Sequence, residues 1–104
     1  MVRALENVLV AEDDDDARDI VEVTLTLEAT IKVRAFSSGA AALDHLRTAP
    51  APDLILLGTA MAGLDGPATL ARIRRMFALA RVPAVFLAAN ADGAEGARLL
   101  SLGA

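Results

Sequence analysis

Cysteine, tryptophan and tyrosine are absent from the 104 residues of the chain, and its only aromatic side chains are Phe36, Phe77 and Phe86. Without cysteine there is no disulfide framework and no thiolate metal site, which is typical of intracellular proteins. No apolar run approaches the roughly 20 residues of a membrane-spanning helix, and no signal-peptide pattern is visible. We therefore expect a cytoplasmic protein without a membrane partner, whose core is packed by aliphatic and alanine side chains.

Charge is unevenly distributed along the chain. The formal net charge is −4, so we expect no general attraction to nucleic acid. Acids concentrate in the run Glu12–Asp16, whereas arginines gather later, at Arg72, Arg74, Arg75 and Arg81. Charge runs of this kind are usually solvated helix faces, and we interpret the arginines in that way.

Short apolar runs alternate with segments of helical periodicity. The runs that predict strands buried on both faces are Val8–Ala11, Ile31–Phe36, Asp53–Leu57 and Val82–Leu87. Helices are predicted from Asp16, over Gly39–Arg47, from Pro67 and from Asp92. The third helix should turn Leu70, Ile73 and Phe77 inward, and the last should carry Ala97 and Leu100 and end at Gly103.

One segment carries two conflicting signals. Val21–Glu28 alternates between apolar and polar residues as a strand does, and its valines and threonines favour strand. The same residues continue a helical spacing that starts with Ala17, Ile20 and Val21 behind an acidic cap at Asp16. We predict a helix because of this cap and because the segment follows a buried strand.

The order strand, helix, strand, helix predicts one α/β domain with a parallel sheet and helices on both faces. Ligands of such sheets bind beyond the carboxyl ends of the strands. Glu12, Asp13, Gly58 and Ala88 all follow predicted strands at that edge. Candidate functional residues should therefore be sought there.

Several motifs in order resemble the receiver domains of two-component response regulators. They are Leu9–Asp14, Pro52–Leu57, Met61–Gly66, Val82–Leu87 and Leu102–Ala104. The resemblance runs from about Val8 to the last residue and implies a flavodoxin-like, doubly wound parallel sheet. It also implies a place in phosphorelay signal transduction, with a histidine kinase or another signalling protein as partner, and no enzymatic turnover of its own.

The resemblance implies a specific site. In receivers an aspartate at the end of the third strand takes a phosphoryl group from a kinase, and it binds Mg²⁺ together with two acids after the first strand. A Ser or Thr after the fourth strand and a Lys after the fifth then contact the phosphate. Phosphorylation biases a two-state rearrangement of the domain.

This chain keeps only part of that set. Glu12 and Asp13 stand at the acid positions, but the acceptor position is Gly58 and the hydroxyl position is Ala88. The chain ends before the lysine would occur. The resemblance therefore implies a degenerate receiver that cannot form an acyl phosphate.

Two acids without a third carboxylate imply a weak or vestigial Mg²⁺ site at Glu12 and Asp13, with the backbone carbonyl of Ala60 as the family's further contact. Asp53, at the opposite end of its strand, and Asp65, several residues beyond the pocket, are poor substitutes as acceptor. His45 is the only histidine and is expected at the surface of the second helix. Residues 58–63 have phosphate-loop spacing, but Leu64 and Asp65 stand where that motif needs Lys and Ser or Thr.

The predicted domain stops after its fourth strand–helix unit, without the fifth strand and helix of the family. The fourth strand would then form an open edge, and we expect the chain to associate with itself there. Two alternatives to a degenerate interaction module remain. One is a small-ligand-binding flavodoxin-like domain using a cavity at Gly58, and the other is a non-functional truncated receiver.

Overall fold

The computed structural model describes residues 5–89 and 97–101, which form one five-stranded sheet in the order β2-β1-β3-β4-β5. β1 (Asn7–Ala11), β2 (Lys32–Phe36), β3 (Leu54–Gly58) and β4 (Ala84–Ala89) run parallel to one another. β5 (Ala97–Ser101) is antiparallel to β4. The four parallel strands and the helices between them confirm the doubly wound, flavodoxin-like architecture.

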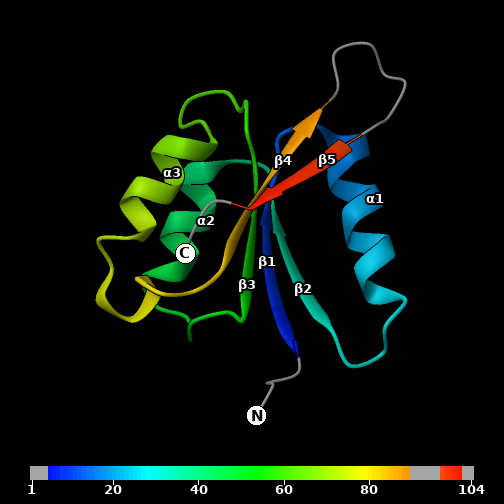
Figure 1. Cartoon of the computed structure of the whole chain (residues 1–104), viewed down its shortest axis with the longest axis horizontal. Coiled ribbons are helices and arrows are strands. Elements are labelled where there is room, and N and C mark those ends of the chain that lie inside the picture. Colours follow the sequence, from blue (N-terminus) through cyan, green and yellow to red (C-terminus); the bar gives the residue numbers. More distant parts are fainter. Residues whose placement is uncertain (1–4, 90–96, 102–104) are drawn as a thin grey trace.

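The sheet separates two helical layers. α2 (Gly39–Leu46) and α3 (Gly66–Ile73) lie on one side, and α1 (Asp15–Thr26) lies on the other (Figure 1). The core between the sheet and the α2–α3 layer is the larger one, and its fully buried side chains include Leu9, Ile55, Leu57 and Ile73. The α1 side is built on Val8, Val10, Leu56 and Leu87 of the sheet. Central strands buried on both faces explain the continuous apolar runs of the sequence.

α1 resolves the conflict between strand and helix in favour of the helix. Its cap, however, is Asp14 rather than the predicted Asp16, because the Asp14 carboxylate accepts a hydrogen bond from the Ala17 N–H at 2.8 Å. The helix buries none of its residues completely, and Ile20, a member of the predicted helical spacing, is exposed. α1 therefore covers its side of the sheet only with half-buried side chains such as Val21 and Leu25.

The end of the α3 segment also differs from the prediction. α3 stops at Ile73, and a short 3₁₀ turn, η1 (Phe77–Leu79), leads into β4. The Arg74 guanidinium holds this connection by donating from Nη1 to the carbonyls of Leu79 and Val82, at 2.9 and 2.7 Å. Leu70 and Ile73 contribute to the core as expected, but Phe77 is 99% exposed because the helix has ended before it.

The last predicted helix is wrong. Residues 97–101 form β5, which pairs with β4 from Val85↔Ser101 to Ala89↔Ala97. Alanine, arginine and leucine favour helix locally, but the edge of β4 offers backbone hydrogen-bonding groups that a strand can satisfy. The expected cap Asp92 and stop Gly103 lie outside the described residues. The open edge predicted for the fourth strand is therefore also wrong, whereas self-association of the chain stays a prediction.

Candidate functional site

Glu12 and Asp13 follow β1 at the carboxyl edge of the sheet, beside the end of β3. The register pairs Ala11 with Leu57, so that Glu12 and Gly58 come next on neighbouring strands. The Glu12 N–H donates to the Phe36 carbonyl at 3.0 Å, which fixes the backbone at this point. The structure thus brings together the two acids and the glycine that the sequence analysis singled out.

The Glu12 side chain lies directly over Gly58. A Cβ atom added at position 58 would lie 2.6 Å from Glu12 Oε1 and 2.9 Å from its Cδ, closer than real side chains pack. Glu12 is only 8% exposed, and Gly58 is buried as well. The carboxylate therefore occupies the space where an acceptor side chain would start, and the cavity expected at Gly58 is not there.

Backbone amides hold both acids in place. Glu12 Oε2 accepts from the Asp14 N–H at 3.1 Å, and Asp13 Oδ2 accepts from the Ala62 N–H at 2.9 Å. The second contact links the turn after β1 to the loop between β3 and α3. Burial raises the pKa of the Glu12 carboxyl, the Asp14 N–H works against this, and the neighbouring carboxylates of Asp13 and Asp14 raise it further.

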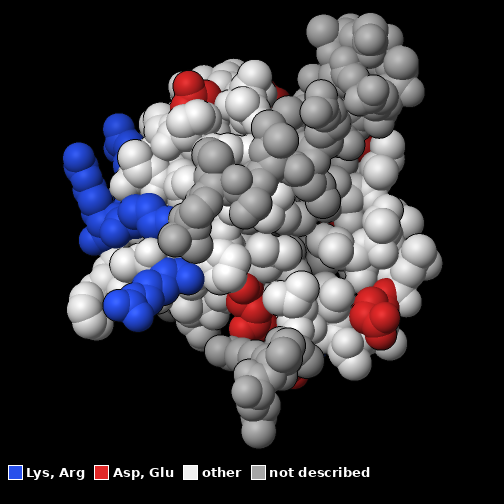
Figure 2. Space-filling view, viewed as in Figure 1, with Lys and Arg blue, Asp and Glu red and all other residues white. Residues whose placement is uncertain are grey.

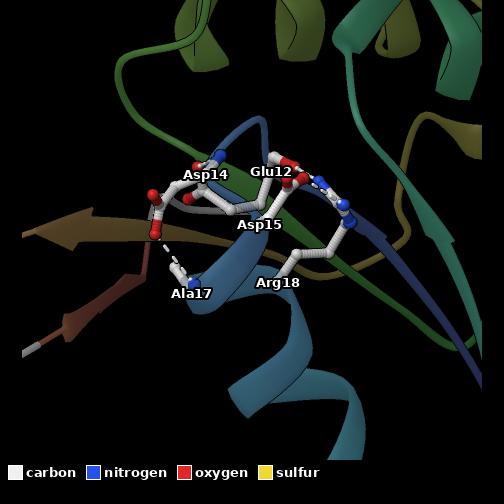
Figure 3. A network of polar contacts seen from close by, with 5 residues as sticks. All are labelled: Glu12, Asp14, Asp15, Ala17 and Arg18. Carbon is white, nitrogen blue, oxygen red and sulfur yellow. Dashed lines mark hydrogen bonds and ion pairs between the residues drawn. The ribbon is translucent and has the colours of Figure 1, made fainter.

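Arg18 is a member of this site that the sequence analysis missed. Its Nη1 donates to the Glu12 carbonyl at 2.8 Å, and its Nη2 pairs with the Asp15 carboxylate. Figure 3 shows Arg18 reaching from the first turns of α1 toward Glu12, on the opposite side from the Asp14 cap. No sequence motif signals this contact, because it depends on how α1 leaves the sheet.

The loop from Thr59 to Asp65 is tied down at both ends. The Thr59 N–H and hydroxyl both donate to the Leu87 carbonyl, at 2.8 and 3.0 Å, so this hydroxyl is engaged with β4. Asp65 caps α3 by accepting from the Ala68 N–H at 2.8 Å. Between them the chain turns through Gly63, whose φ of 78° is a conformation that favours glycine.

The structure also shows where three other predicted residues lie. Ala60 is an exposed member of the β3–α3 loop, and Ala88 is in β4, where it pairs with Arg98. Asp53 lies at the amino edge of the sheet, where its Oδ2 accepts from the N–H groups of Glu6 and Asn7 at 3.0 and 2.9 Å. Asp53 and the capping residue Asp65 thus both have structural roles.

These residues fit a metal ion poorly. Two carboxylates remain of the three that the receiver site uses, and each already accepts a backbone hydrogen bond. Within the described residues no group of three or more His, Cys, Asp or Glu side chains could hold a metal ion. Mg²⁺, which requires near-octahedral oxygen ligands, would have to draw most of them from water.

The fold and the edge at which its acids meet define the class of protein. The model of the response regulator receiver domain family matches residues 8–104, and the chain belongs to that family. It is accordingly a receiver domain of two-component signalling, a class of signalling module that interacts with histidine kinases and other signalling proteins and that generally has no enzymatic activity. Receiver domains typically bind Mg²⁺ at the phosphorylation site. No helix of the described residues is long and apolar enough to cross a membrane.

Relatives agree with this assignment. The chain is 35% identical over 98 residues to the transcriptional regulatory protein CseB of Streptomyces coelicolor, a match that covers 94% of this chain and 40% of the relative. CseB of Streptomyces avermitilis matches to the same extent. The chain thus spans about 40% of the length of the curated relatives it matches.

Solved structures show the same fold. The N-terminal domain of a response regulator receiver protein from Methanoculleus marisnigri JR1 is 31% identical, with a TM-score of 0.75 over 84% of this chain and 69% of that one. The phosphorylated cyanobacterial phytochrome response regulator RcpA is 27% identical, also with a TM-score of 0.75, over 85% of this chain and 68% of that one.

Proposed function

We propose that this receiver domain does not accept a phosphoryl group and acts in two-component signalling through contacts with other proteins. The observation that carries the proposal is the Glu12 carboxylate lying over Gly58, where a reactive side chain would otherwise begin. An attacking carboxylate must lie in line with the phosphoryl group and beside the metal. Glycine supplies no such atom, and Asp53 and Asp65 are held elsewhere by backbone hydrogen bonds.

Other groups that receivers use to hold the phosphate are also missing or engaged elsewhere. Ala88 supplies no hydroxyl to a bound phosphate, and the hydroxyl of Thr59 donates to the Leu87 carbonyl. We propose that the acid pair binds Mg²⁺ weakly for want of the third carboxylate, and that the domain turns over no substrate. A histidine kinase or another signalling protein remains the proposed partner.

The test is to incubate the protein with Mg²⁺ and phosphoramidate and to record its intact mass. We expect no phosphate-sized increase. An increase that hydroxylamine removes would show an acyl phosphate and would refute the proposal. The variant Gly58→Asp, treated in parallel, controls for the activity of the phosphodonor.

A small-ligand-binding role is not favoured. That reading required an open cavity at Gly58, and the Glu12 carboxylate fills this space.

A further inference from the structure

The segment after the β3–α3 loop concentrates positive charge. Residues 66–91 contain four arginines and no acid, in a chain whose net charge is −4. Figure 2 shows Lys and Arg side chains gathered over α3 and the turn that follows it. We name the exposed residues Arg72, Arg75 and Phe77 the arginine surface.

Nothing in the described part of the chain neutralises this surface. The side chains of Arg72 and Arg75 form no hydrogen bond or ion pair there, whereas Arg74 between them is engaged with two backbone carbonyls. Arg81 is exposed nearby but shares a hollow with Asp53, so the unopposed charge is strongest at Arg72 and Arg75.

The arginine surface also offers apolar contact. Phe77 is the most exposed large hydrophobic residue of those described, at 99%. It borders a hollow of about 350 Å³ that is lined mainly by apolar side chains, among them Leu46, Ala49, Met76 and Leu79. Arginine and phenylalanine are enriched in protein interfaces, and an exposed aromatic ring beside a hollow is a natural anchor point.

A surface of complementary character lies on α1. Asp16, Asp19, Ile20 and Val23 follow the spacing of one helix face and are all exposed, with Ile20 at 66% and Val23 at 61%. The side chains of Asp16 and Asp19 form no hydrogen bond or ion pair within the described residues, since Arg18 pairs with Asp15 instead. We name these four residues the acidic α1 face.

The two surfaces cannot meet within one molecule. α1 lies on one side of the sheet, and α3 with η1 lies on the other (Figure 1). They can meet only between two copies, the acidic α1 face of one on the arginine surface of the next. Because the two surfaces differ, such a contact is heterologous, and repeating it adds further copies instead of closing a symmetric dimer.

We propose that copies of this chain associate head to tail, with the acidic α1 face of one copy seated on the arginine surface of another. Asp16 and Asp19 face Arg72 and Arg75, and Ile20 or Val23 packs against Phe77 and its hollow. The chain itself thus supplies an occupant that matches the arginine surface in charge and in apolar character.

Sedimentation velocity over a series of protein concentrations up to about 100 μM tests this, in roughly 20 mM and 500 mM salt, which differ several-fold in Debye length. We expect the mean sedimentation coefficient to rise with protein concentration at low salt and to return to the monomer value at high salt. The double variant Arg72→Glu/Arg75→Glu should stay monomeric, and so should Asp16→Lys/Asp19→Lys. Mixing these two variants should restore association, because each retains the surface that the other has lost and their reversed charges are also complementary.

Lys32→Glu/Arg34→Glu is the matched control, because it makes the same change in net charge at two exposed residues of β2. It should associate like the wild type. Circular dichroism checks that each variant is folded, and Phe77→Ser, which should also weaken association, replaces any that is not. The proposal would be overturned if the wild type stayed monomeric at low salt or if the two variants did not associate when mixed. It would also be overturned if the control variant lost association to the same extent as the other variants. A monomer that binds duplex DNA through Arg72 and Arg75 would likewise overturn it, since the occupant would then be nucleic acid.

Discussion

At the scale of single residues, Gly58 and Glu12 form one unit, because one side chain occupies the space that the other lacks. The replacement Gly58→Asp should push the Glu12 carboxylate outward at little cost, since the atoms in its way are the far end of a flexible side chain. A third carboxylate would then join the acid pair. We expect the affinity for Mg²⁺ to rise by roughly tenfold or more, since both charge and ligand number increase.

Isothermal titration calorimetry of the wild type and Gly58→Asp with Mg²⁺ measures this change. Thr48→Asp is a suitable control, because it adds the same charge at an exposed position just after α2, away from the acid pair. Equal affinities for the wild type and Gly58→Asp would show that position 58 is not part of a metal site.

The raised pKa of Glu12 predicts a pH dependence of stability. Burial makes the folded protein hold this proton more tightly than the unfolded chain does. The free energy of unfolding therefore falls as pH rises from the ordinary carboxyl pKa through the raised one, and the cost persists at neutral pH. Glu12→Gln should remove this loss, so that its stability relative to the wild type is greater at pH 7 than at pH 4.

Urea unfolding at both pH values, in the presence of EDTA to exclude metal, provides the measurement. Asp19→Asn is the control, because this exposed carboxylate has no such burial. A stability difference between Glu12→Gln and the wild type that is the same at both pH values would contradict the assigned cause.

These residues also show which features of the site could be predicted from the sequence alone and which could not. The meeting of Glu12, Asp13 and Gly58 followed from the rule that parallel strands end at one edge. The position of the Glu12 carboxylate and the contact from Arg18 did not, because both depend on side-chain conformations that no spacing encodes.

At the scale of elements, the predicted and the observed N-terminal caps of α1 are different residues. The sequence predicts the cap at Asp16, whereas the structure places it at Asp14. Asp14→Ala should therefore lower the free energy of unfolding by about 1 kcal/mol through loss of the cap. Asp16→Ala should change it by a few tenths at most, apart from the interaction with the helix dipole.

Urea denaturation of the two variants gives both values under the same conditions. A larger loss for Asp16→Ala than for Asp14→Ala would support the cap predicted from sequence over the one observed.

Element prediction succeeded where the order of elements supported the local pattern and failed where tertiary contacts overrode it. α1 was correctly assigned against its strand-like alternation because a helix is required between two parallel strands. β5 was missed because its residues favour helix, and only the free edge of β4 makes a strand preferable. Phe77 was misplaced because its spacing continued a helix that ends at Ile73.

At the scale of the whole molecule, the two helical layers differ in how much they bury. α2 and α3 together place seven of their residues in buried positions, whereas α1 places none. We expect amides of β1 and β3 to exchange with solvent slowest and those of α1 to exchange at least about tenfold faster, because α1 contributes no buried residue of its own. Hydrogen exchange followed by NMR checks this order, and protection of α1 equal to that of β3 would contradict it.

The separation of charge between the two sides of the sheet has a practical consequence for handling the protein. Carboxylates of Asp16 and Asp19 on α1, opposed by guanidinium groups of Arg72 and Arg75 across the sheet, give the molecule a permanent electric dipole that its net charge of −4 does not reveal. A charged chromatography resin binds the oppositely charged side of such a molecule, even when the net charge of the molecule would oppose binding. The protein should accordingly be retarded on a cation exchanger at neutral pH and low salt, although its pI of about 4.8 would forecast that it passes straight through.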